Sequence, residues 1–167
     1  ELNPQARFLP WLLSRANGSL KVKKEIMRGA YMISESQDPG DFLSDLILRT
    51  LVDHQERRDV VLCGTGALTR MLKHKSRVMP VIRRGAHVIL IRLHKRYSKD
   101  KNRDIVKNCI EALTFLVSTN RVQKWFTSYV RDYFLESIIL NCPTAELLPV
   151  SLELFEKWLT AVKTYDP

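Results

Sequence analysis

The chain carries the stretch DVVLCGTGALTRML at residues 59–72, and the related stretch DIVKNCIEALTFLV follows at residues 104–117. The two stretches align at a spacing of 45 residues and share Asp, Val, Ala, Leu and Thr. A fainter copy lies 43 residues further on, and its expected core positions are Leu148, Leu152, Phe155 and Leu159. Because periods of about 40–47 residues are typical of stacked helical units, this repeat decides the predicted fold.

Outside the repeat, apolar residues also recur at helical spacing, as in the segment 41–56. Turn signals such as Asp38-Pro39-Gly40 separate segments of helical rather than strand length. We therefore predict an all-α protein of about eight helices. The predicted helices span residues 5–15, 20–35, 41–56, 60–74, 78–97, 104–119, 121–140 and 148–163.

Three features of these segments resemble HEAT and armadillo repeats. They are the unit length, a small residue at the tight helix contact (Ala30, Ala67 and Ala112) and a proline that opens a helix (Pro80 and Pro149). Small residues let helices approach closely, and proline is tolerated in a first turn because its missing N–H would be unpaired there. The resemblance implies an α-solenoid, a right-handed α-α superhelix of about three and a half helical units.

A length of 167 residues predicts a single domain, 1–167. The chain begins with Glu1-Leu2-Asn3-Pro4, without an initiator Met or a signal-peptide pattern, so we expect it to be part of a longer protein. The phrase Asn141-Cys142-Pro143-Thr144-Ala145-Glu146, followed by an apolar helix, resembles helical regions that flank the catalytic domain of very large ubiquitin-specific proteases. That resemblance implies a scaffold segment of a large multidomain enzyme as one alternative.

The net charge of +9 arises in one part of the chain. Residues 70–107 carry thirteen basic and two acidic side chains, whereas the flanking segments are nearly balanced. A protein surface normally mixes the two signs to limit self-repulsion, so a block of one sign predicts an acidic partner. A basic solvated surface without a partner is the alternative.

We predict that side chains of this block form the partner-binding surface. At one helix hairpin we expect Arg70, Lys73, Arg77, Arg83, Arg84 and His87. At the opposite end we expect Lys95, Arg96, Lys99, Lys101 and Arg103. The preferred ligand is an acidic peptide or protein surface, because arginine forks pair with carboxylates. The alternative is a nucleic-acid backbone, which the scarcity of aromatic residues in the block disfavours for single strands.

Enzymatic signatures are sparse, so we predict a non-enzymatic protein without metal or cofactor. The histidines show no metal-binding spacing and are predicted on the surface: His54, His74, His87 and His94. Gly64 and Gly66 lack the strand and third glycine of a phosphate loop, so they are expected to serve close helix packing. A nucleophilic pair of Cys63 with His54 or His74 would need an activating elbow or helix N-terminus.

The three cysteines, Cys63, Cys109 and Cys142, are far apart and have no CxxC spacing. Their apolar neighbours predict buried free thiols, which indicate a reducing compartment, cytoplasm or nucleus. No stretch reaches the ~20 uninterrupted apolar residues of a membrane span. We predict that three sets of side chains lie in the core, because their burial is strongly favourable: Leu113, the aromatic residues of 121–140, and Trp158.

Overall fold

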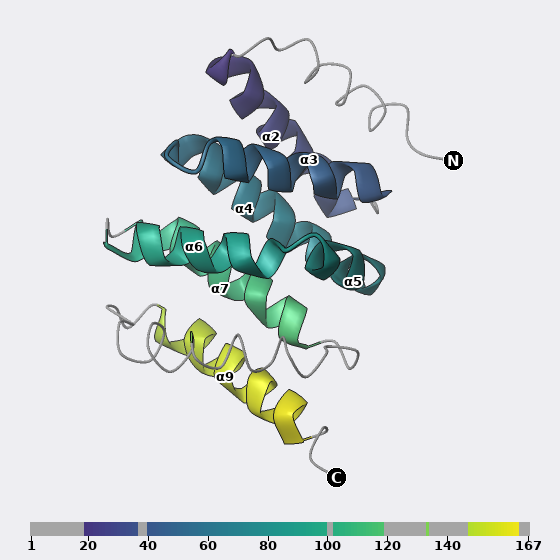
Figure 1. Cartoon of the computed structure of the whole chain (residues 1–167), viewed down its shortest axis with the longest axis vertical. Helices are drawn as coiled ribbons and strands as arrows, with labels where there is room; N and C mark the ends of the chain where they lie inside the picture. Colours follow the sequence, from purple (N-terminus) through teal and green to yellow (C-terminus); the bar gives the residue numbers. More distant parts are fainter. Residues whose placement is uncertain (1–18, 37–39, 100–101, 119–132, 134–146, 164–167) are drawn as a thin grey trace.

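A computed structural model describes residues 19–36, 40–99, 102–118, 133 and 147–163. Seven helices account for most of these residues, and no strand occurs among them (Figure 1). The helices are α2 (Leu20–Ser36), α3 (Gly40–Asp53), α4 (Arg58–Leu72), α5 (Lys75–Arg83), α6 (Ala86–Lys99), α7 (Arg103–Val117) and α9 (Leu148–Lys163). The all-α prediction is confirmed for the described residues. The predicted helix 5–15 lies outside the described residues. The predicted helix 121–140 also lies outside them, except for Tyr133.

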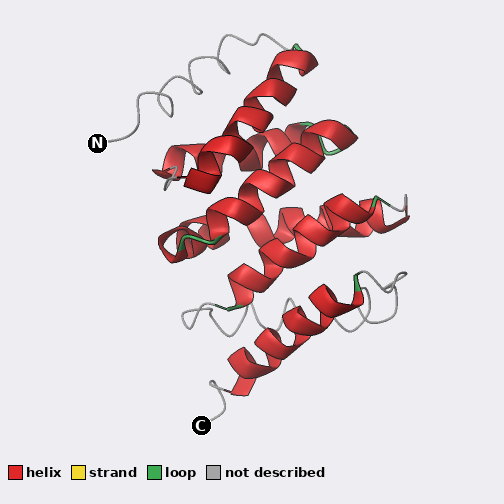
Figure 2. Cartoon of the chain, turned by 180° about the vertical axis from the view of Figure 1, so that it is seen from behind, coloured by secondary structure: helices red, strands yellow, loops and turns green. Residues whose placement is uncertain are grey.

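The helices are arranged in two rows. In one row α2 packs on α4, α4 on α7 and α7 on α9, so that these four lie side by side in chain order (Figure 2). In the other row α3 packs on α4 and α6 packs on α7 (Figure 1). Since α4 and α7 have neighbours in both rows, they contribute a large share of the buried core.

The two copies of the repeat form equivalent helices, α4 and α7. Each helix begins one residue before the repeated stretch. Ala30, Ala67 and Ala112 are all fully buried, as expected for small residues at close helix contacts. Leu113 is fully buried as well, which confirms its predicted place in the core.

Glycines and polar side chains set the contacts of α4. A Cβ atom on Gly64 would lie 2.7 Å from Leu51 Cδ2 of α3, and one on Gly66 would lie 3.0 Å from the Tyr31 ring of α2. The prediction that both glycines serve close packing is therefore confirmed. Toward α7, the hydroxyl of Thr69 donates a hydrogen bond of 3.0 Å to the backbone oxygen of Asn108.

The predicted single helix over 78–97 is wrong, because the structure has two helices there, α5 and α6. Gly85 lies between them with a φ of +77°, a left-handed conformation that interrupts the helix and that L side chains rarely adopt. Pro80 also lies inside α5 rather than at its start. Proline in a helix interior removes one backbone hydrogen bond, and α5 ends three residues later, at Arg83. Pro149 is the second residue of α9, as predicted.

The third copy of the repeat is rotated from its predicted orientation. Leu148, Leu152 and Leu159 are 49%, 57% and 37% exposed, and Phe155 is only partly buried. The buried face is instead formed by Leu147, Ser151, Leu154 and Trp158. The predicted alignment was one residue out of register, which corresponds to a rotation of about 100°. The burial predicted for Trp158 is confirmed.

Replacing Gly85 by alanine is expected to lower the free energy of unfolding by about 1–2 kcal/mol. A Cβ atom added at Gly85 would meet no atom of the described residues within 4 Å, so the loss would come from the backbone conformation and not from a clash. The midpoint of urea denaturation measures it. Gly85→Asn is the control and should lose less, because asparagine adopts positive φ more readily. Equal midpoints for wild type and Gly85→Ala would contradict this explanation of the break.

Candidate functional site

The predicted basic residues that flank or belong to α6 lie toward its two ends. Arg83 and Arg84 precede this helix, and Lys95 and Arg96 lie in its second half. An α-helix rises about 1.5 Å per residue, so His87 and Lys99 are roughly 18 Å apart along its axis.

Arg70 contributes to the packing of α4 on α2. Its guanidinium lies 3.6 Å from the centre of the Tyr31 ring and donates a hydrogen bond to the Tyr31 hydroxyl. The side chain is half-buried. A guanidinium stacked on an aromatic ring stabilises the contact between the two helices, so Arg70 is engaged within the fold.

Two further arginines form ion pairs with acidic residues from outside the basic block. Arg84 pairs with Asp45 of α3, and Arg96 pairs with Glu56 in the turn before α4. Tyr97 strengthens the second contact, because its hydroxyl donates a hydrogen bond of 3.0 Å to the backbone oxygen of Gln55. These pairs neutralise part of the charge that the sequence concentrates in residues 70–107.

The prediction of surface positions is wrong for His87 and His94, which are 5% and 4% exposed. Both lie on the buried face of α6, and burial lowers the pKa of each imidazole. The pKa of His94 falls to about 4, with a further contribution from Lys95. His94 contacts the Tyr133 ring edge-on at 5.4 Å between centroids. His87 therefore does not belong to an exposed binding surface.

The cysteines differ in burial. Cys109 is fully buried and Cys63 is half-buried, and both are free thiols. The prediction of buried free thiols is therefore confirmed for Cys109 and only in part for Cys63. Burial raises the pKa of both. A nucleophilic cysteine needs a lowered pKa, so neither environment activates its thiol. Cys142 lies outside the described residues.

The remaining predicted residues are mainly exposed. Lys73, Arg83, Lys95 and Arg103 are exposed, and Arg77 is half-buried. The ammonium group of Lys95 lies 5.5 Å from the centre of the Tyr133 ring. Lys99 is the last residue of α6, and Lys101 lies outside the described residues.

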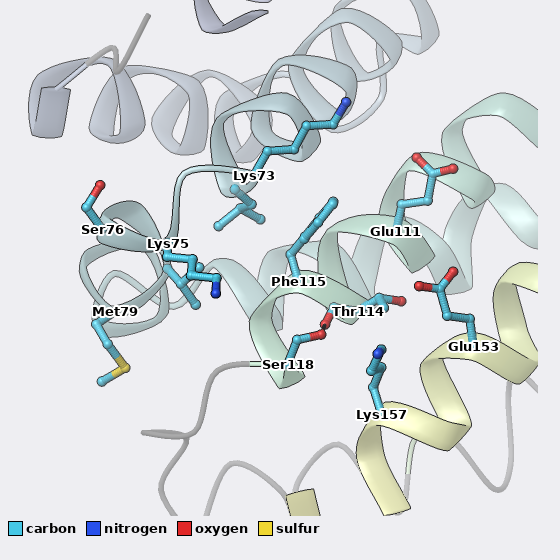
Figure 3. Close-up of a pocket in the computed structure, with 12 residues that line it drawn as sticks. Lys73, Lys75, Ser76, Met79, Glu111, Thr114, Phe115, Ser118, Glu153 and Lys157 are labelled. Carbon is cyan, nitrogen blue, oxygen red and sulfur yellow. Dashed lines mark hydrogen bonds between the residues drawn. The ribbon is translucent and has the colours of Figure 1, made fainter. Parts of the chain in front are cut away.

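Lys73 borders a pocket of about 940 Å³ between the end of α4, α5, α7 and α9 (Figure 3). Its apolar lining consists of Leu72, Val78, Met79 and Phe115. Its charged lining consists of Lys73, Lys75, Glu111, Glu153 and Lys157. The hydroxyl groups of Ser76, Thr114 and Ser118 complete it. Of these lining residues, the sequence-based prediction of the binding surface named only Lys73, and part of the remaining lining comes from α7 and α9, which are distant in the sequence.

The charges around this pocket are incompletely neutralised. Glu111 forms an ion pair of 3.9 Å with Lys107, one turn away on α7. In the part of the chain that the structure describes, no acidic side chain forms an ion pair with Lys73, Lys75 or Lys157. These three ammonium groups add positive charge to the lining of the pocket.

The chain matches no protein-family model, no curated protein and no solved structure. Across the described helices and turns, no group of three or more His, Cys, Asp or Glu side chains is placed to hold a metal ion. None of the described helices combines the length and the apolar character that crossing a membrane requires.

Proposed function

We propose that the chain is a non-enzymatic protein-protein interaction scaffold that binds an acidic peptide or protein surface through residues 70–107. The observation that carries this proposal is that Lys73 and Lys75 line a pocket together with apolar side chains. Exposed cations beside apolar surface suit a protein ligand, which supplies carboxylates and apolar side chains together.

The arrangement of the helices supports a repeat scaffold. The 45-residue repeat and the two rows of helices are compatible with a right-handed superhelix of HEAT or armadillo-like units. Such solenoids present extended surfaces that are used to hold partners. The resemblance of residues 141–146 to regions of very large ubiquitin-specific proteases makes a scaffold segment of a large enzyme a proposed context.

The ion pairs favour a protein ligand over a nucleic acid. Binding a phosphate backbone depends mainly on the number of cations that neutralise phosphates. Arg84 and Arg96 are engaged by Asp45 and Glu56 and so are less available for such contacts. A protein ligand requires fewer cations, because buried apolar anchors supply much of the binding energy.

The test is fluorescence anisotropy with two labelled probes, a glutamate-rich dodecapeptide that contains leucine and a random single-stranded oligonucleotide. We expect the peptide to bind, and Lys73→Glu/Arg83→Glu to weaken it by about tenfold or more, equivalent to ~1.4 kcal/mol. The matched control is Lys21→Glu/Arg28→Glu on α2, which makes the same charge change at exposed sites far from the pocket and should stay within about twofold.

Two results would contradict the proposal. Equal losses in the two double variants would indicate non-specific attraction to the net charge. Tight oligonucleotide binding at ~50 mM salt that falls by several decades at ~200 mM would indicate a nucleic-acid backbone ligand instead.

A further inference from the structure

We infer that the pocket between α5, α7 and α9 anchors a linear peptide segment in which a large apolar side chain stands next to a carboxylate. This inference rests on the proposed function. It specifies the chemical class of the partner and the pocket that binds it. It follows from the apolar lining of the pocket, from its charges and from their distribution around it.

The apolar lining provides the anchor. Met79 and Phe115 are half-buried, so part of each side chain is exposed, whereas Leu72 and Val78 are buried. Phe115 lies at the centre of the pocket, between α5 and α9 (Figure 3). A volume of about 940 Å³ lies within the range of sites that hold drug-sized ligands, so a leucine or an aromatic side chain has room here. Such an anchor gains free energy mainly by leaving water.

The charges specify what stands beside the anchor. Lys73 and Lys75 lie on the side of α4 and α5, whereas Glu111, Glu153 and Lys157 lie on the opposite side, on α7 and α9 (Figure 3). A carboxylate of the ligand is attracted to the first side, whereas on the second side the two glutamates repel it and Lys157 offsets only part of that repulsion. The pocket therefore favours an acidic residue on one side of the apolar anchor and disfavours acidic residues on both sides.

The probe is a phage library of random dodecapeptides selected on the whole chain. We expect the selected peptides to be enriched in Asp or Glu within a few positions of a Leu, Met, Phe or Trp, with the acidic residues mainly on one side. A synthetic peptide of the consensus sequence, labelled with a fluorophore, then measures the affinity. A selection that yields no acidic and apolar enrichment would overturn both this inference and the proposed function.

Variants then locate the site. Lys73→Ala/Lys75→Ala should weaken the consensus peptide by roughly 3- to 30-fold. The matched control, Arg49→Ala/Arg58→Ala, removes two exposed cations outside both the pocket and the proposed binding surface and should change the affinity by less than about twofold. Met79→Ala should weaken binding roughly fivefold through lost apolar contact. Circular dichroism checks that each variant is folded.

The glutamates supply a test with the opposite sign. Glu153→Gln should tighten binding by about two- to fivefold, because it removes a charge that repels the ligand carboxylate. A general loss of stability could not produce this gain. If acidic peptides are selected but respond to Arg83→Ala/Arg92→Ala, in the basic block outside the pocket, and not to Lys73→Ala/Lys75→Ala, the pocket inference is overturned while the proposed function stands.

Discussion

Replacing Leu113 by alanine is expected to lower the free energy of unfolding by ~2–5 kcal/mol. Leu113 is fully buried on α7, the helix that packs on α4, α6 and α9, so the truncation would leave a cavity at the centre of the molecule. The loss is a large fraction of the ~5–15 kcal/mol that typical domains possess. Urea denaturation followed by circular dichroism measures it.

The matched control is the same substitution at Leu152 of α9, which is 57% exposed. Leu152→Ala should change the free energy of unfolding by no more than ~0.5 kcal/mol, as is usual for surface positions. An unchanged midpoint for Leu113→Ala, or equal losses for the two variants, would show that α7 and α9 do not bury the faces described above.

Acidification is expected to cost about 3 kcal/mol of stability through His94 alone. Burial lowers the pKa of His94 in the folded chain from 6.5 to about 4, so the unfolded chain binds the proton first as the pH falls. The full stability is therefore present above pH ~6.5, and this contribution is lost as the pH falls toward ~4. His87 acts in the same direction, because burial lowers its pKa as well.

The variant His94→Phe tests the assignment, since it retains an aromatic ring against Tyr133 and removes the titrating group. Ser98 retains a hydrogen bond of 2.7 Å from its hydroxyl to the backbone oxygen of residue 94. Urea denaturation between pH 7 and pH 5 should show a smaller loss of stability for the variant than for the wild type. Parallel pH profiles would assign the acid sensitivity to other groups.

Much of the helical fold was predictable from the sequence. The repeat at 59–72 and 104–117 places buried residues at matching positions, and α4 and α7 carry them as predicted. The sequence was ambiguous for α9, because two overlapping sets of apolar residues both have helical spacing. Contacts with α7 select the set that contains Leu154 over the set that contains Leu152. The break at Gly85 could not be predicted, because it depends on the positive φ of this residue and glycine adopts positive and negative φ about equally readily.

The candidate site was predictable only in part. Lys73 belongs to the basic block and could be identified by charge alone. Glu111 and Glu153 border the same pocket, but they meet it only because α7 and α9 pack side by side. His87 was misplaced because its basic neighbours Arg83 and Arg84 are exposed, whereas His87 lies on the buried face of α6. Arg96 was predicted to face a partner, and its acidic neighbour Glu56 lies 40 residues away.

The row formed by α2, α4, α7 and α9 also determines how the molecule opens. Along this row the principal contacts join successive helices, so detaching α9 breaks its interface with α7 and leaves the packing of α2 on α4 intact. Local opening at the α9 end therefore costs less than global unfolding, and protection against hydrogen exchange should be greatest in the middle of the row. The pocket takes one wall from α9, so a ligand bound there would oppose local opening at this end of the row.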